Sequence, residues 1–155
     1  MPVVGDSVNA VNASVLAGER GIKLSHQQTV EATGYKNLIS VIIRTSKGEH
    51  SFAVTMFADQ LPRLVMLDKC EVDVYLEGML LIFSNIDHPG VIGDVGQLLG
   101  ENEINIAHFS LGRRRPGGEA LAIVAIDNTI NDQTLTALRG LKNMKWVKII
   151  SFDKN

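Results

Sequence analysis

The chain has 155 residues, of which 45% are hydrophobic and 21% charged, and its formal net charge is -2. This composition is ordinary for a soluble globular protein with one domain or two small ones. The acidic balance argues against a nucleic-acid partner, because phosphate neutralisation needs a basic surface, and no apolar run approaches the roughly 20 residues that span a membrane. A lone cysteine, Cys70, and an N-terminus without a secretory signal indicate a cytoplasmic protein.

The first half of the sequence predicts one helix followed by a small antiparallel sheet. Apolar residues recur at helical spacing over residues 8–20, and Gly21 can close the helix. From residue 36 the period changes to two, with β-rich runs at 38–44, 51–57, 64–67 and 72–76. One helix and four short strands make a thin core, so this half is expected either to lack a piece or to pack against a partner.

The second half begins with a predicted strand at residues 79–84 and a helix after it. Pro89 suits the first helical position and Gly100 the end of the helix. Gly93 and Gly96 lower helix propensity, and we interpret them as positions that let the helix sit close to a sheet. The apolar residues of this helix are expected on one face: Val91, Ile92, Val95, Leu98 and Leu99.

Two more strands, a second helix and a final strand complete this half. Strands are expected at 104–111 and 120–127, with a turn over residues 112–118 between them. The helix begins after Asn131, a good N-cap, and ends near Gly140. With a last strand at 146–152, the order βαββαβ predicts an α+β, ferredoxin-like arrangement with both helices on one sheet face. The first half or a second copy of the chain must cover the other face.

A polar turn at residues 85–90 joins the first strand of this half to its helix. The helix N-terminus that opens there presents free N–H groups and the positive end of the helix dipole, which favour a carboxylate. Asn85 and Asp87 supply acceptors for an ammonium group. The turn therefore predicts a site for a small amino acid rather than a catalytic centre. The plainer alternative is that Asp87 only caps the helix.

Residues 87–93, in the polar turn, and 105–107, after the helix, resemble ACT domains, the amino-acid-sensing modules of metabolic enzymes. Residues 8–13, 19–22 and 63–65 of the first half are similar to the allosteric-substrate-binding domain that precedes the ACT domain in long-form bacterial D-3-phosphoglycerate dehydrogenases. The resemblance covers roughly residues 7–152 and divides the chain into a partial allosteric-substrate-binding domain, 1–76, and an ACT domain, 77–155. The residues that carry it are 87–93, 105–107, 8–13, 19–22, Phe57, 63–65, Asp68 and 72–73.

The resemblance implies an effector, L-serine or a similar small amino acid, bound between the ACT domains of two self-associating chains. His88 stands where the family usually has Arg, which makes any anion contact there dependent on pH. The resemblance also implies upstream catalytic domains or a catalytic subunit. The expected effector-binding residues are Asn85, Asp87, His88, Pro89, Gly90, Val91, Ile92 and Asn105.

Catalysis is not expected within this chain. It has no G-x-G-x-x-G fingerprint. Asp87, His88, His108 and Ser110 carry chemically active side chains, but their spacing indicates neither a triad nor a zinc site. No cofactor is therefore expected here, and the resemblance implies that NAD binds elsewhere in the full-length oxidoreductase.

Basic residues raise two further possibilities. Arg63 matches one position of a cluster that holds a phosphate-bearing ligand in some relatives, but the other two positions are Tyr75 and Ala125, so a solvated sheet edge is favoured over an anion site. The run at 113–115 is interpreted as the solvated tip of a hairpin, which could pair with acidic residues of another domain or subunit.

Two alternatives stay open at this point. One is the β-subunit of a bacterial L-serine dehydratase, which joins the same two modules. The other is an ACT-like dimerisation module without a ligand. The sequence does not distinguish an inhibitory from an activating effector.

Overall fold

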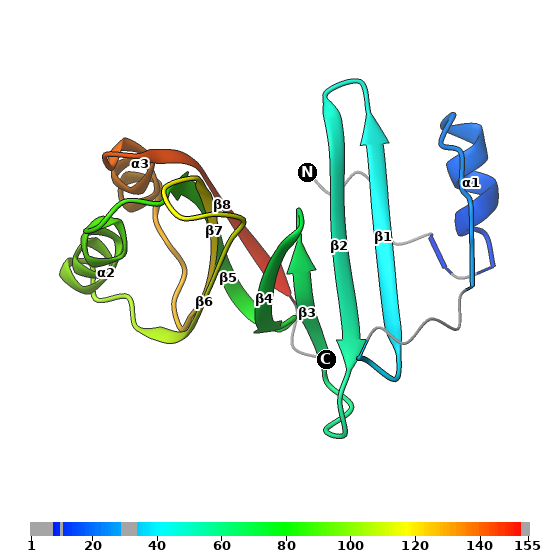
Figure 1. Cartoon of the computed structure of the whole chain (residues 1–155), viewed down its shortest axis with the longest axis horizontal. Helices are drawn as coiled ribbons and strands as arrows, with labels where there is room; N and C mark the ends of the chain where they lie inside the picture. Colours follow the sequence, from blue (N-terminus) through cyan, green and yellow to red (C-terminus); the bar gives the residue numbers. More distant parts are fainter. Residues whose placement is uncertain (1–7, 10, 29–33, 153–155) are drawn as a thin grey trace. The chain divides into compact units, whose positions relative to one another are not determined.

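The computed structural model describes residues 8–9, 11–28 and 34–152. The chain divides into two compact units, Met1–Ala32 and Thr33–Asn155 (Figure 1). Both sheets of the described residues lie in the second unit.

The first unit contains one short helix, α1 (Ala13–Glu19), which has no buried residue. It is shorter than the predicted helix over residues 8–20. The side chain of Asn9 accepts hydrogen bonds from the backbone N–H groups of Val11 and Asn12, at 2.9 and 3.1 Å, and turns the chain before α1 begins. Gly21, with φ of 72°, ends the helix as predicted, since glycine adopts this left-handed conformation without strain.

The second unit begins with a four-stranded antiparallel sheet in the order β1-β2-β3-β4. All four predicted strands are confirmed, with slightly wider bounds: β1 (Leu38–Thr45), β2 (Gly48–Met56), β3 (Pro62–Leu67) and β4 (Cys70–Tyr75). Strand β1 is an edge strand, and its side chains Ile39, Ile42 and Ile43 are 69%, 55% and 46% exposed.

The second sheet has the predicted βαββαβ order, and its strands lie in the order β6-β7-β5-β8 (Figure 1). All its neighbouring strands are antiparallel, which confirms the ferredoxin-like fold. Its elements are β5 (Gly78–Ile86), α2 (Val91–Glu101), β6 (Ile106–Arg113), β7 (Glu119–Ile126), α3 (Asp132–Gly140) and β8 (Met144–Phe152).

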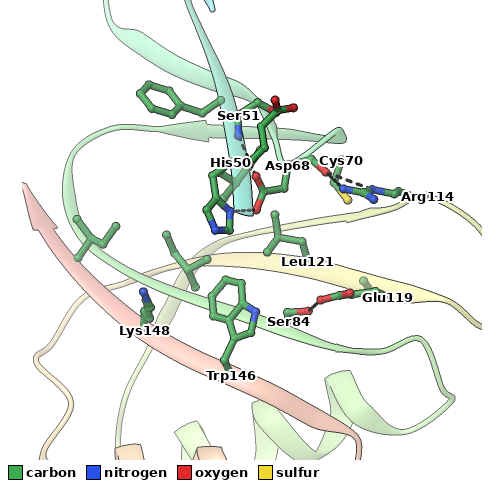
Figure 2. A pocket seen from close by; sticks show the side chains of 16 residues that line it. His50, Ser51, Asp68, Cys70, Ser84, Arg114, Glu119, Leu121, Trp146 and Lys148 are labelled. Carbon is green, nitrogen blue, oxygen red and sulfur yellow. Dashed lines mark hydrogen bonds and ion pairs between the residues drawn. The ribbon is translucent and has the colours of Figure 1, made fainter. Parts of the chain in front are cut away.

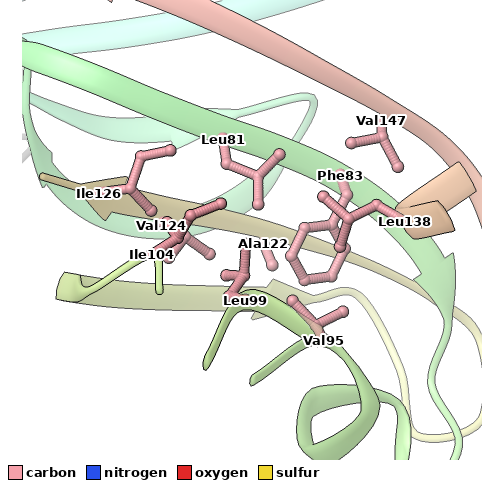
Figure 3. Packing of buried hydrophobic residues seen from close by; sticks show 10 residues of the cluster. All are labelled: Leu81, Phe83, Val95, Leu99, Ile104, Ala122, Val124, Ile126, Leu138 and Val147. Carbon is pink, nitrogen blue, oxygen red and sulfur yellow. The ribbon is translucent and has the colours of Figure 1, made fainter. Parts of the chain in front are cut away.

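The main core lies between this sheet and its two helices (Figure 3). Val95 and Leu99 of α2 and Leu138 of α3 are fully buried against Leu81 and Phe83 of β5. The N-terminus of α3 is capped as predicted, because the side chain of Asn131 accepts a hydrogen bond of 2.8 Å from the N–H of Thr134.

The opposite face of this sheet is covered, at β5 and β7, by the first sheet. Buried residues of β3 and β4 pack there against Leu80, Ile82, Leu121 and Ile123. Of the two candidates named from the sequence, the first half of the chain is therefore the one that covers this part of the face.

Strands β4 and β6, each an edge of its own sheet, are joined by side chains. Ser110 accepts a hydrogen bond of 2.9 Å from the N–H of Asp73, and Nε2 of His108 lies 2.7 Å from the carbonyl oxygen of Asp73. Further along, Gly112 lies so close to β4 that a Cβ atom would stand 2.3 Å from the carbonyl oxygen of Glu71. Gly112 was expected in a turn, and it belongs to β6 instead.

The interpretation of helix α2 needs three corrections. Pro89 lies outside the helix, which begins at Val91 after Gly90 as N-cap. Gly100 lies inside the helix, and Glu103 follows its C-cap with φ of 56°. Gly93 and Gly96 do not bring α2 close to the sheet, because a Cβ atom at either position would meet nothing within 4 Å.

No helix in the part of the chain that the structure describes is long and apolar enough to cross a membrane.

Candidate functional site

The polar turn starts at the end of β5 with a buried amide side chain. Asn85 is 2% exposed, and its Nδ2 donates a hydrogen bond of 2.8 Å to the carbonyl oxygen of Ile86. Its Oδ1 is buried and has no hydrogen-bond partner among the described residues. Since buried polar atoms are nearly always bonded, this oxygen is an acceptor that a group from outside the described residues can use.

Asp87 does not cap α2; it is held by the hairpin between β6 and β7. Its Oδ2 accepts hydrogen bonds from Nη1 of Arg113, at 2.7 Å, and from the N–H of Gly117, at 3.1 Å. These contacts, the one with Arg113 first, hold the pKa of the Asp87 carboxyl below its usual range. Both bonds go to Oδ2, so within the described residues Oδ1 is left to face another donor.

Helix α2 opens with its first turn uncapped by any described side chain. Gly90, the N-cap, has φ of 100°, a conformation that favours glycine. The ring of His88 turns towards the backbone, with Nδ1 2.8 Å from the carbonyl oxygen of Pro89. Val91 is buried and Ile92 is 40% exposed, so Ile92 can contact a ligand or another chain. Backbone N–H groups at such a helix start suit a carboxylate.

Asn105 lies far from the turn in the same chain. Its Nδ2 donates a hydrogen bond of 2.6 Å to Asp127, which follows β7, whereas the N–H of Asp87 bonds to Gly118, which precedes β7. The eight residues of β7 separate the two ends by about 24 Å. The structure thus brings together seven of the eight expected effector residues, those at 85 and 87–92, and leaves Asn105 at the other end of the sheet.

Arg63, the candidate for an anion site, is enclosed by aromatic rings and carboxylates. Its guanidinium lies over the rings of Tyr75, at 4.1 Å, and Phe57, at 5.0 Å. It also donates to Asp73 at 3.2 Å and to the Tyr75 hydroxyl, and Asp59 lies 3.9 Å away. Two carboxylates already neutralise this cation, which argues against an anion there.

The hairpin arginines are not simply solvated, because two of them make contacts inside the chain. Arg113 bonds to Asp87, and Arg114 donates to the carbonyl oxygen of Asp68 in the turn between β3 and β4. The role of Arg113 in holding the polar turn was missed from sequence. The available signal was the run of three arginines at 113–115, which begins 26 residues after Asp87 of the polar turn.

No group of three or more His, Cys, Asp or Glu side chains that could hold a metal ion occurs in the described residues. Cys70 is buried in strand β4, as expected of a small strand residue.

Comparisons with known proteins match both halves of the chain. Residues 1–68 match the family model described as the D-3-phosphoglycerate dehydrogenase intervening domain, and residues 79–143 match that of the ACT domain.

Curated relatives extend the match over almost the whole chain. A D-3-phosphoglycerate dehydrogenase of Bacillus subtilis is 35% identical over 149 residues, which is 96% of this chain and 28% of the relative. One of Methanocaldococcus jannaschii is 33% identical over 97% of this chain and 28% of the relative. One of Archaeoglobus fulgidus is 31% identical over 96% of this chain and 29% of the relative. The chain thus spans under a third of the length of these relatives.

Proposed function

From the premise that this chain joins an intervening domain of the D-3-phosphoglycerate dehydrogenase family to an ACT domain, we propose that it binds L-serine for feedback control. The effector site is the polar turn at residues 85–92. The observation that carries the proposal is the buried, unpartnered Oδ1 of Asn85 in the same turn as the uncapped start of α2.

The turn suits both charged ends of an amino acid. The effector carboxylate accepts from the first backbone N–H groups of α2, where the helix dipole is positive. Its ammonium group donates to Oδ1 of Asn85 and Oδ1 of Asp87. Arg113 supports this arrangement, since it keeps the Asp87 carboxyl ionised and fixes its orientation through Oδ2.

A complete site requires two chains. Asn105 lies about 24 Å from the turn of its own chain, so its amide reaches an effector only from a partner ACT domain. A two-fold dimer then carries two equivalent sites, each with the turn of one chain and Asn105 of the other. Serine that bridges both chains favours the paired state, and pairing in turn tightens serine binding.

In the full-length protein, this pairing would act on upstream domains that carry out NAD-dependent oxidoreduction in the cytoplasm. A coupling free energy of roughly 1–3 kcal/mol is typical of such control. The alternative, a serine dehydratase subunit, has less support, because the family model of the first half and the relatives described above are those of D-3-phosphoglycerate dehydrogenase.

Thermal unfolding with L-serine, D-serine and L-alanine tests the ligand. L-serine is expected to raise the unfolding temperature selectively, because a ligand that binds only the folded state stabilises it by mass action. The Asn85→Ala variant should lose this shift. If no amino acid shifts the curve of a chain that still dimerises, the ligand-free assembly module is the better account.

Mixing two variants tests whether the site is shared. Asn85→Ala and Asn105→Ala chains should each lose the serine response when alone. In a mixed dimer one site carries both defects and the other carries neither. With equal amounts of the two chains, about half of the dimers are mixed, so about a quarter of all sites should bind serine again. If the mixture stays unresponsive although mixed dimers form, Asn105 does not act across the interface. Asn85→Ala mixed with Asp87→Ala is the control, because both defects lie in the turn and neither site of that mixed dimer is intact.

A further inference from the structure

We propose that the cleft between the two sheets binds an amphipathic monocarboxylate, a molecule with one carboxylate and an apolar chain or ring. The cleft has a volume of about 610 Å³, within the range of small-molecule sites. It lies beyond the part of the second sheet that the first sheet covers. This site shares no residue with the polar turn at 85–92 and does not depend on the function proposed above.

The cleft has both apolar and polar walls, since eight of its sixteen lining residues carry polar or charged side chains (Figure 2). Ile82 and Leu121 form part of the floor, and Trp146 and Ile150 of β8 line it while remaining 36% and 41% exposed. Val147 and Ile149, which alternate with these residues along β8, pack into the core beneath the helices. The exposed indole and isoleucine are therefore the outer row of β8, and a ligand in the cleft would remove them from water.

Most charged groups around the cleft already have partners within the chain. The Asp68 carboxylate accepts from the N–H of Ser51 at 2.9 Å and lies 2.9 Å from Nδ1 of His50. Glu119 accepts from the Ser84 hydroxyl at 2.6 Å and from Lys145 at 3.0 Å. These carboxylates are thus satisfied and do not call for a cationic ligand.

Two cations of the cleft form no ion pair with a described carboxylate. Arg114 donates to the carbonyl oxygen of Asp68, whereas Lys148 has no described partner. Lys148 lies between Trp146 and Ile150 on the same row of β8, opposite Ile82 in the neighbouring strand. Among the described residues, no carboxylate forms an ion pair with its ammonium group. An uncompensated cation in an apolar row is complementary to an anion that has an apolar body, and this pairing defines the ligand class.

The single tryptophan of the sequence makes the test specific, since Trp146 itself lines the cleft. Octanoate does not absorb where tryptophan does, so its titration can be followed by the fluorescence of Trp146. We expect a saturable change. In the series hexanoate, heptanoate, octanoate, affinity should rise about fourfold per methylene, the factor for burying one such group.

Two comparisons test the part played by charge. Octylamine should leave the fluorescence unchanged, and octyl phosphate separates a general anion site from one for carboxylates. Lys148→Gln should weaken octanoate about fivefold, the factor for an exposed ion pair of about 1 kcal/mol. Lys142→Gln, an exposed position outside the cleft with the same change in charge, should bind as the parent chain does.

The proposal is overturned by any of three results. One is no fluorescence change with octanoate up to its micelle-forming concentration. Another is a failure of charge selectivity. Octylamine or octyl phosphate would then give the same response as octanoate, or Lys148→Gln would bind octanoate as tightly as the parent chain does. The third is a change in Trp146 fluorescence that follows protein concentration rather than ligand, which would assign the cleft to a second copy of the chain.

Discussion

Gly112 and Gly93 differ in whether the surrounding structure leaves room for a side chain. Gly112 lies where β6 passes over β4, and a side chain there would overlap the backbone of Glu71. Gly93 lies on the exposed side of α2, where a methyl group meets nothing within 4 Å. The sequence suggested the reverse, a packing role for Gly93 and a turn for Gly112, because the spacing of residues along one segment does not reveal which strand from elsewhere passes nearby.

Gly112→Ala is expected to lower the free energy of unfolding by about 1–3 kcal/mol, since the backbone of β4 must move to admit a methyl group. Gly93→Ala should raise it by about 0.5–1 kcal/mol through better helix propensity. Urea unfolding with a shared m-value measures both changes. If Gly93→Ala is instead destabilising, the exposed side of α2 packs against another chain in solution.

Helix ends show most clearly how far the sequence can predict the elements. The start of α3 was predictable, because the side chain of Asn131 caps the helix by accepting from the N–H of Thr134. The end of α2 was not, because Glu103 adopts the left-handed conformation that usually belongs to glycine. The backbone bond from the N–H of Ile104 to the carbonyl oxygen of Leu99, at 2.9 Å, and the burial of both side chains hold it there.

Glu103→Gly should therefore stabilise the protein by about 1 kcal/mol, because glycine removes the cost of the left-handed conformation without losing a described contact of the side chain. Glu101→Gly, two residues earlier and inside α2, should cost about the same amount. Thermal unfolding of the two variants side by side checks the expectation. Equal destabilisation by both would show that the Glu103 side chain contributes a contact of its own.

Most helices and strands were predictable from sequence periodicity, and the ferredoxin-like arrangement of the second sheet followed from the element order. The contact between the sheets did not. His108 and Ser110 were weighed as chemistry-bearing residues, yet they satisfy the backbone of Asp73 at the edge of β4. The polar turn was similarly predictable as a segment, whereas its support by Arg113 depends on a hairpin that closes 26 residues later in the chain.

Acid is expected to lower the free energy of unfolding of the second unit. A hydrogen bond from Arg113 holds the pKa of the Asp87 carboxyl below its ordinary value. Hydrogen bonds from Ser84 and Lys145 do the same for the pKa of Glu119. A lowered pKa means stability that is fully present above the unfolded-state value of about 4 and is lost as the pH falls through the folded-state value.

We therefore expect the urea midpoint to be steady from neutral pH down to about pH 5 and to fall below that. Glu119→Gln should flatten part of the fall, because one of the linked protons is gone. Glu19→Gln, a substitution with the same change in charge on α1, should keep the parent slope. An unchanged slope for Glu119→Gln would remove Glu119 from this explanation.

Strand β1 has a practical consequence for anyone who prepares this protein. Its outer edge is unpaired among the described residues, it carries isoleucines on both faces, and it has no proline or charge before Arg44. Such a segment is a template for cross-β growth. Storage at high concentration is expected to favour intermolecular strand addition at β1. Ile39→Lys changes the most exposed of its three isoleucines and should block the first step of fibril formation.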